Sequence, residues 1–279
     1  MPVDLHIHTT ASDGGLSPKQ VVELASRLGL STIAISDHDT VKGIDEALAY
    51  GKKLHVKVIP ALELSSKFNS RDIHVLGYFI DHKSKKLLKA LKHLRDSRFE
   101  RAVKIINCLK KNGIAISLDD VLAVAGSASI GRPHIARVLH KKNYVESFAD
   151  AFNKYLGKDA PCYFEKFVYS LKEAIGIIHE AGGLAVFAHP GLAKVDEHIS
   201  DFIAMGLDGI EVYHVDHPPE VVAHYKKLAK EYNLLIVGGS DCHGEASRHG
   251  LRLGTIPVPD EVADGLKAAQ STHQAHSPH

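Results

Sequence analysis

The stretch DLHIHTTASDG, residues 4–14, places two histidines two positions apart and follows them with an aspartate. Successive side chains of a β-strand point to opposite faces, so His6 and His8 are expected on the same face of a strand. Two buried imidazoles side by side need several hydrogen-bond partners between them, which makes a packing role awkward for both. Asp13, in the turn that follows, adds a carboxylate that could bind the same group as these two rings.

Histidines and carboxylates recur where later strand-like runs end. These are His38 in SDHDT, Glu63 in PALELS, His74 in DIHVLG, His189 in FAHPG, and Asp241 and His243 in GGSDCHG. The carboxyl ends of parallel strands lie on one face of a barrel, where active sites are built. Histidine combined with carboxylate suits Zn²⁺, Mn²⁺ or Fe²⁺ better than Mg²⁺ or Ca²⁺. Nine potential ligands, with Asp13 included, are too many for one ion and imply two or three.

Each motif taken alone also has an ordinary structural explanation. The first two histidines could be a satisfied structural pair, and His38 could cap a helix. Glu63 could pair with a lysine, and His74 could be a core residue bonded to the backbone. The Pro190–Gly191 turn alone could account for FAHPG. Independent explanations would not place every one of these residues at the same end of successive strands, so their joint occurrence favours a metal centre.

Short apolar runs that read as strands alternate with helical patterns. The expected strands span residues 3–8, 31–38, 56–64, 72–80, 183–190, 208–214 and 234–241, and residues 254–259 could add a short eighth. Such near-continuous apolar runs are typical of parallel strands covered on both faces, and a βαβα order implies right-handed crossovers. Ser17 and Ser170 are the expected N-caps of two connecting helices. We therefore predict an α/β fold with a seven-stranded (β/α)7 barrel of the TIM type.

One long segment, residues 83–168, differs in character because it is basic and helical in its spacing. We expect it to be an all-helical insertion domain. Residues 1–82 and 169–270 would then form a discontinuous barrel, and residues 271–279 a disordered tail. Most lysines of the insertion are better explained as a solvated helix face than as a binding patch.

Composition excludes several classes of protein. Hydrophobic residues make up 44% and charged residues 24% of the 279 residues, which fits a soluble globular protein. A net charge of +1 provides no global field for long-duplex nucleic acid or an anionic membrane. No apolar run reaches the length of a transmembrane helix and no secretory signal is evident, so we expect a cytoplasmic protein without an obligate protein partner. Three unpatterned cysteines argue against a secreted disulfide scaffold.

The motifs DLHIHTTASDG, SDHDT, ALELS, IHVLGY, FAHPG and GGSDCHG, in this order, resemble the PHP family, named for polymerase and histidinol phosphatase. The resemblance implies a distorted seven-stranded barrel with a multi-metal centre, with Mn²⁺ preferred and Zn²⁺ or Fe²⁺ as alternatives. The implied metal ligands are His6, His8, Asp13, His38, Glu63, His74, His189, Asp241 and His243. The residues expected to carry catalysis are Asp13, Glu63, Asp241 and His243.

The identity of residue 13 bears on the substrate. Family members that act as histidinol phosphatases tend to have histidine where this chain has Asp13. The aspartate and a helical insertion carrying GRPH are more similar to the branch that hydrolyses nucleoside 3′,5′-bisphosphates, for example phosphoadenosine phosphate to AMP. Some members of that branch also trim short RNA from its 5′ end. The expected substrate is a small phosphorylated nucleotide or a short RNA 5′ end, with histidinol phosphate, or a metal-binding domain without catalysis, as alternatives.

Arg132, His134 and His214 are the expected substrate-binding residues. The GRPH segment at a helix start would aim a guanidinium fork and backbone N–H groups at an anion, although Arg132 could instead form a surface salt bridge. His214, at the end of a strand, could contact the phosphate or cap the barrel. Asp37 and Asp39 in SDHDT could orient imidazoles or cap a helix.

Cys242 and Arg248 provide a competing signal, because their C-x5-R spacing matches the phosphate loop of cysteine-dependent phosphatases. That chemistry needs a thiolate of low pKa in a loop of converging N–H groups. Here His243 intervenes, Glu245 would repel a phosphate dianion, and the loop is not rich in glycine. Covalent cysteine catalysis is therefore disfavoured.

Overall fold

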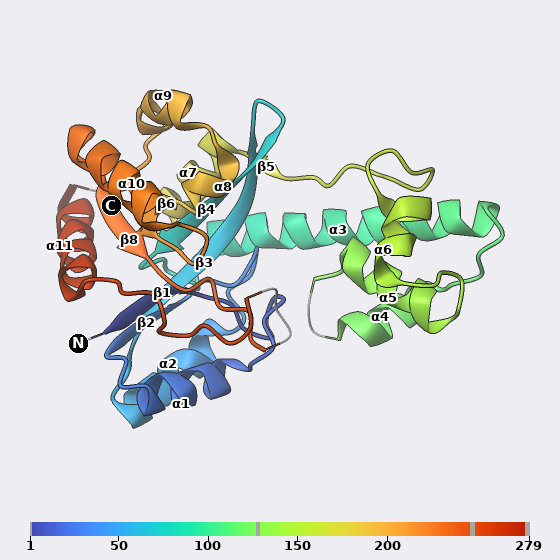
Figure 1. Ribbon diagram of the computed structural model, residues 1–279, viewed down its shortest axis with the longest axis horizontal. Helices are drawn as coiled ribbons and strands as arrows, with labels where there is room; N and C mark the ends of the chain where they lie inside the picture. Colours follow the sequence, from blue (N-terminus) through green and yellow to red (C-terminus); the bar gives the residue numbers. More distant parts are fainter. Residues whose placement is uncertain (1, 127–128, 246–248, 277–279) are drawn as a thin grey trace. The chain divides into compact units, whose positions relative to one another are not determined.

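Figure 1 shows a computed structural model of the chain, which describes residues 2–126, 129–245 and 249–276. The chain forms two compact units. Met1–Ala90 and Val168–His279 form the first, here called the sheet unit, and Leu91–Phe167 form the second, the helical unit. The domain boundaries expected from the sequence, at residues 82–83 and 168–169, stay a prediction.

The sheet unit is built on one sheet of mostly parallel strands. Its strands are β1 (Val3–Ile7), β2 (Thr32–Ile35), β3 (Lys57–Phe68), β4 (Arg71–Tyr78), β6 (Leu184–Phe187), β7 (Gly209–Tyr213) and β8 (Leu235–Gly238), paired in this order, with β5 (Tyr169–Ser170) beside β3. Neighbouring strands are parallel except that β4 is antiparallel to both β3 and β6. The expectation of an all-parallel sheet is therefore wrong at β4. The physical reason is the two-residue turn at Asn69 and Ser70, both with positive φ, which joins β3 directly to β4 as a hairpin.

The closed barrel predicted from the sequence is not confirmed. Among the described residues, the two end strands β1 and β8 share no ladder, and a single bridge joins Ile7, the last residue of β1, to Cys242, which follows β8. His8 N donates there to the carbonyl oxygen of Cys242 at 3.1 Å. Residues 254–259, which could have added a short eighth strand, do not form a strand. What the structure establishes is an α/β fold whose first and last strands lie side by side.

Helices connect these strands and cover the sheet (Figure 1). They are α1 (Pro18–Arg27), α2 (Ile44–Leu54), α7 (Leu171–Glu180), α8 (Pro190–Ala193), α9 (Ile199–Ala204), α10 (Pro219–Glu231) and α11 (Asp260–His276), with a 3₁₀ turn at Asp196–His198. Ser17 begins α1 and Ser170 begins α7, each in a capping box, as the sequence predicts. No helix in the described part of the chain is long and apolar enough to cross a membrane.

The C-terminal segment differs from its prediction. Helix α11 continues to His276, so residues 271–276 are helical rather than a disordered tail, and residues 277–279 lie outside the described residues. Gln270 is buried and donates from Nε2 to the carbonyl oxygen of Gly182 at 3.0 Å. This tertiary contact anchors the helix at the point where the polar composition suggested that structure would end.

The helical unit has its own hydrophobic core. It contains the C-terminal part of α3 (Lys85–Lys111), then α4 (Leu118–Ala125), α5 (Arg132–Lys141), α6 (Phe148–Ala151) and a π-helical turn (Phe152–Leu156). A disulfide between Cys108 and Cys162 joins α3 to the segment that follows these helices. This bond departs from the expectation drawn from the cysteine count, because both residues lie in one core although 54 positions separate them.

Candidate metal centre

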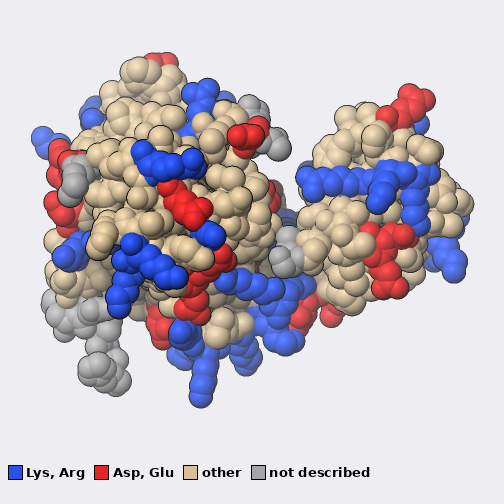
Figure 2. Space-filling model, turned by 90° about the horizontal axis from the view of Figure 1, so that it is seen from below, with Lys and Arg blue, Asp and Glu red and all other residues tan. Residues whose placement is uncertain are grey.

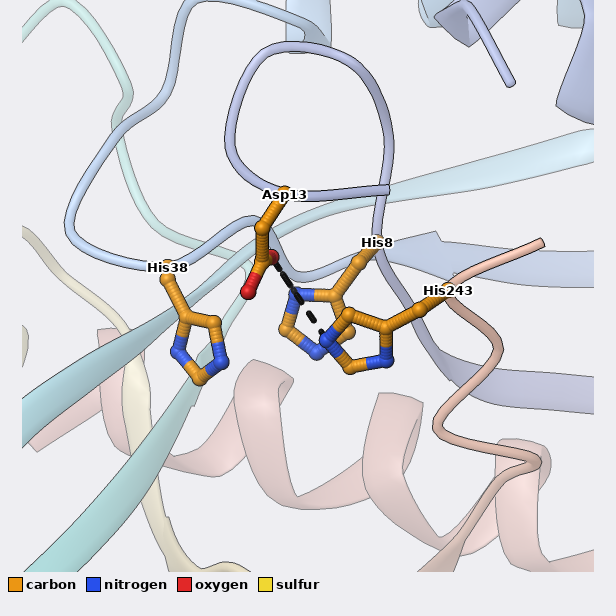
Figure 3. Close-up of side chains that lie close together, drawn as sticks. All are labelled: His8, Asp13, His38 and His243. Atoms are coloured by element: carbon orange, nitrogen blue, oxygen red, sulfur yellow. Dashed lines mark ion pairs between the residues drawn. The ribbon is translucent and has the colours of Figure 1, made fainter. Parts of the chain in front are cut away.

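All nine predicted metal ligands meet at one end of the sheet. Their ligand atoms form three overlapping groups, each within 4.8 Å: His8, Asp13, His38 and His243; His6, His8, Glu63 and Asp241; and His38, Glu63 and His74. The ninth residue, His189, has its Nε2 2.9 Å from Glu63 Oε1. Figure 3 shows the first group, in which three imidazoles lie beside the carboxylate of Asp13. Residues scattered over more than 230 positions of the chain thus form a single cluster.

Glu63, in β3, is the hub of this cluster and is fully buried. Its Oε1 lies 2.7 Å from His74 Nδ1. Its Oε2 lies 3.2 Å from a ring nitrogen of each of three further histidines, His6, His8 and His38. Burial would raise the pKa of this carboxyl, but the surrounding imidazoles, His38 first, hold the pKa well below its usual range. Glu63 is therefore ionised at neutral pH and offers both oxygens to the cluster.

His8 and His38 respond differently to the same burial. Burial lowers the pKa of His8, but hydrogen bonds to Asp241 and Glu63 outweigh that effect and raise the pKa to about 10. For His38, burial outweighs the attraction of Glu63 and lowers the pKa below its ordinary value. Protonated His8 thus balances the charges of Glu63 and Asp241. A divalent cation bound there would replace this proton.

Unsatisfied atoms test whether the cluster fits metal ions. His8 Nδ1, His38 Nδ1 and Asp241 Oδ1 are buried and have no partner with good hydrogen-bond geometry, although His38 Nδ1 lies 3.2 Å from Glu63 Oε2 and Asp241 Oδ1 lies 3.0 Å from His8 Nε2. Leaving a buried polar atom unsatisfied costs about 1–3 kcal/mol, so three at one site are expensive without a further ligand. Imidazole nitrogens and carboxylate oxygens are donors that bind Mn²⁺, Zn²⁺ and Fe²⁺, and the residues present therefore fit a cluster of divalent ions.

Two of the predicted ligands have a strained backbone conformation. His189 and Asp241 have φ of +30° and +48°, in the left-handed region that non-glycine residues avoid. His189 stands just before α8, and Asp241 follows β8. Backbone strain of this kind persists only where surrounding contacts fix it, and it concentrates at functional sites.

Glu211, in β7, is a member of the site that the sequence analysis missed. Its side chain is fully buried; Oε1 accepts from His6 Nδ1 at 2.9 Å and Oε2 accepts from the backbone N–H of His189 at 2.7 Å. Because Nδ1 of His6 carries the donated proton, its Nε2 presents a lone pair to the cluster. The available signal was a carboxylate inside the otherwise apolar run DGIEVYH.

Asp37 and Asp39 position backbone near the cluster. Asp37 accepts from the backbone N–H and the hydroxyl of Thr9, both at 2.7 Å, and so holds the loop that carries Asp13. Asp39 accepts from the backbone N–H of Ser65 at 2.9 Å and from its hydroxyl at 3.1 Å. These bonds show Asp37 supporting a ligand-bearing loop instead of contacting an imidazole.

His214, a predicted substrate-binding residue, lies beside the cluster and is 2% exposed. Its Nδ1 accepts from the backbone N–H of Asp216 at 3.1 Å, so the neutral ring carries its proton on Nε2. That nitrogen is 3.4 Å from Asp241 Oδ2. The ring can therefore donate a hydrogen bond at the edge of the centre.

Arg132 and His134, the other two predicted substrate-binding residues, belong to the helical unit. Arg132 donates to the carbonyl oxygen of Leu156 at 2.9 Å, and its guanidinium lies over the ring of Tyr163, 5.3 Å from the centroid. His134 Nδ1 accepts from the backbone N–H of Gly131 at 3.0 Å, which caps the start of α5. The contacts of Arg132 are thus with a carbonyl and an aromatic face.

Cys242 does not have the surroundings of a nucleophile. It is 4% exposed and packs in a hydrophobic cluster with Ile7 and Val21. Arg248, its partner in the C-x5-R spacing, lies outside the described residues. A thiol that is buried among apolar side chains is not accessible to a phosphate ester, which argues against covalent catalysis.

Comparisons with known proteins agree with this geometry. Residues 4–236 match the PHP domain. The chain is 36% identical over 245 residues to a 5′-3′ exoribonuclease of Haemophilus influenzae, covering 86% of this chain and 89% of that one. It is 33% identical over 254 residues to a 3′,5′-nucleoside bisphosphate phosphatase of Chromobacterium violaceum, covering 88% and 89%. Among solved structures, a protein of Bifidobacterium adolescentis described as a metal-dependent phosphoesterase superposes with a TM-score of 0.82 at 32% identity, covering 96% and 97%.

Proposed function

We propose that this chain, a metal-dependent phosphoesterase that belongs to the PHP domain family, removes the 3′-phosphate of nucleoside 3′,5′-bisphosphates. The observation that carries the proposal is the convergence of nine histidine and carboxylate ligands around the buried, ionised Glu63. A centre with two metal ions is one arrangement that phosphatases use, because the ions stabilise both the attacking and the leaving oxygen of the ester.

The donor groups divide naturally between ions. One ion would be held by Asp13, His38 and His243, and another by His6, Glu63 and Asp241, with His8 in reach of either set. His74 and His189, both bonded to Glu63 Oε1, would complete the set. When bound, divalent ions neutralise phosphate charge and make water a nucleophile near neutral pH. The preference for Mn²⁺ over Zn²⁺ or Fe²⁺ is part of this proposal.

The chain's own residues would then bind and orient the ester. Glu63 and Asp241 stay ionised and hold the centre, because neighbouring imidazoles lower the pKa of both carboxyls against the effect of burial. His214 would donate from Nε2 to a phosphate oxygen in place of Asp241. Asp13 is 57% exposed at its side chain and would stand where substrate enters. His243 would complete the catalytic set.

The choice of a nucleotide substrate is supported by two relatives. By name, the exoribonuclease acts on RNA and the bisphosphate phosphatase on nucleoside bisphosphates, and they match most of this chain at 36% and 33% identity. Arg132 and His134 are proposed to bind the phosphate that is not removed. Trimming of short RNA from its 5′ end is a second candidate activity, favoured by the exoribonuclease relative.

Phosphate release from defined substrates tests the proposal. Protein stripped with EDTA and reloaded with Mn²⁺, Zn²⁺ or Fe²⁺ would be given phosphoadenosine phosphate, AMP or histidinol phosphate. We expect AMP as the product of the first substrate and little release from the other two. Faster release from histidinol phosphate, or no release from any phosphate ester with every metal, would contradict it. Short RNA labelled at either end would show whether mononucleotides leave from the 5′ side.

A further inference from the structure

A groove in the helical unit combines charge and aromatic surface. It has a volume of about 350 Å³ and lies between α3 and the segment that returns along it after the short helices (Figure 1). Arg101 and Lys104 line it from α3, and Phe164 and Phe167 line it from the returning segment. A volume of this size is at the lower end of the range for small-ligand sites, enough for about one nucleotide.

Arg101 is fixed at the groove with its charge retained. Its Nε donates to the carbonyl oxygen of Phe164 at 2.7 Å, which leaves the two terminal nitrogens of the guanidinium for other partners. Partial burial, together with the positive charges of Arg132 and Arg98, lowers the pKa of Arg101 to about 10, so it stays charged at neutral pH. Guanidinium groups held near one another repel, and an anion between them relieves that repulsion.

Phe167 adds an exposed aromatic face. Its side chain is 42% exposed, and its ring meets that of His93 edge to face at a centroid distance of 4.6 Å. An aromatic ring beside arginine and lysine is the combination on which bases of single-stranded nucleic acid stack while their phosphates are neutralised.

Carboxylates at the same groove argue against a site for free phosphate. Glu100 and Glu165 also line it. They would oppose a compact dianion, whereas a carboxylate accepts hydrogen bonds from the amino groups of cytosine, adenine or guanine. Lys and Arg side chains also gather beside Asp and Glu elsewhere on the helical unit (Figure 2), so charge alone does not mark this groove.

We propose that this groove binds single-stranded RNA, with a backbone phosphate at Arg101 and Lys104 and a base stacked on Phe167. This inference rests on the proposed function, because its ligand is RNA of the kind that the metal centre is proposed to trim. A duplex would not suit it, since paired bases cannot stack on a side chain.

Fluorescence anisotropy with a 3′-labelled, 5′-phosphorylated oligoribonucleotide, in EDTA to prevent hydrolysis, tests the inference. Lys104→Gln changes an exposed side chain and should weaken binding several-fold. It should also lower the slope of log affinity against log salt by about 0.7, the value for one phosphate contact on a single strand. Phe167→Ala should weaken binding roughly 5- to 100-fold. The matched control is Arg137→Gln, an exposed arginine on α5, which should bind like the parent.

Two results would overturn the inference. One is parental affinity and salt slope in both Lys104→Gln and Phe167→Ala. The other is an equal loss in Arg137→Gln, which would show binding by diffuse charge. Hydrolysis of phosphoadenosine phosphate by the same samples separates this inference from the proposed function. Lys104→Gln should hydrolyse it at the parental rate, and failure of the parent to hydrolyse it would count against the metal-centre proposal while the RNA titration still judges the groove.

Discussion

Glu211 and His6 are joined by a hydrogen bond of 2.9 Å between two fully buried side chains, one in β7 and one in β1. The second oxygen of Glu211 holds the backbone of His189, so one carboxylate orients ligands from two strands. Carboxylate partners of this kind fix the tautomer of a ligating histidine and raise its basicity.

Glu211→Gln should therefore weaken metal binding by about 10- to 100-fold while the fold persists. Equilibrium dialysis followed by elemental analysis measures the affinity directly, and circular dichroism monitors the fold. Glu220→Gln, at an exposed position in the first turn of α10, is the matched control and should bind metal like the parent. Unchanged affinity in Glu211→Gln would show that the bond to His6 is only structural.

Glu63→Gln should abolish phosphoesterase activity by at least about 1,000-fold, because a neutral amide cannot anchor cations from both oxygens. The amide also leaves its imidazole neighbours without their common anion. Elemental analysis should show fewer ions per chain. Retention of both the ions and the activity would remove Glu63 from the centre.

The pKa of His8 predicts how the metal-free protein responds to pH. Its folded-state pKa, about 10, exceeds the ordinary value of 6.5, so its contribution to stability is fully present below pH 6.5 and is lost as the pH rises toward 10. In EDTA, the free energy of unfolding should fall across that window, and the fall should be smaller in His8→Gln. Metal affinity should rise over the same interval, because a bound ion displaces the proton. Urea titrations at several pH values measure the first effect.

Reduction of the Cys108–Cys162 bond should destabilise the helical unit. The bond closes a loop of 54 residues, for which the chain-entropy model gives about 4 kcal/mol. Denaturation with and without dithiothreitol measures this difference. The double variant Cys108→Ser, Cys162→Ser should be insensitive to the reductant, and a parent that is equally insensitive would show that the bond does not form.

Cys242→Ala should keep most of the phosphoesterase activity, because the thiol faces a hydrophobic cluster. The substitution should instead lower the free energy of unfolding, because it removes a buried sulfur atom from the hydrophobic cluster. Steady-state kinetics with the metal-loaded protein checks this. Abolished turnover with normal metal content would revive the covalent mechanism.

The sequence predicted which side chains lie close together because their signals are local. An alternation such as that of His6 and His8 reports which residues share a face of a strand, and strand ends identify a common edge. The convergence of these side chains follows from the order of the strands, which the alternation of strands and helices in the sequence predicts. Ser17 and Ser170 likewise predict the start of their helices, because their capping-box partners are only three positions away.

The missed features depend on contacts that sequence spacing does not encode. The turn at Asn69 and Ser70 reverses the chain without a proline or glycine, so the antiparallel β4 was read as one more parallel strand. Glu211 lies within an apolar run, and its role exists only through partners more than 20 positions away. The two bonded cysteines meet through the packing of the helical unit, which a count of cysteines does not reveal.

The bridge between Ile7 and Cys242 has a consequence for synthesis on the ribosome. His6 lies in β1 and His8 directly after it, whereas Asp241 and His243 follow β8, so a nascent chain carries an incomplete set until β8 and the residues after it have been made. Products of termination before Asp241 would lack this carboxylate and imidazole, and would be unable to hydrolyse phosphate esters.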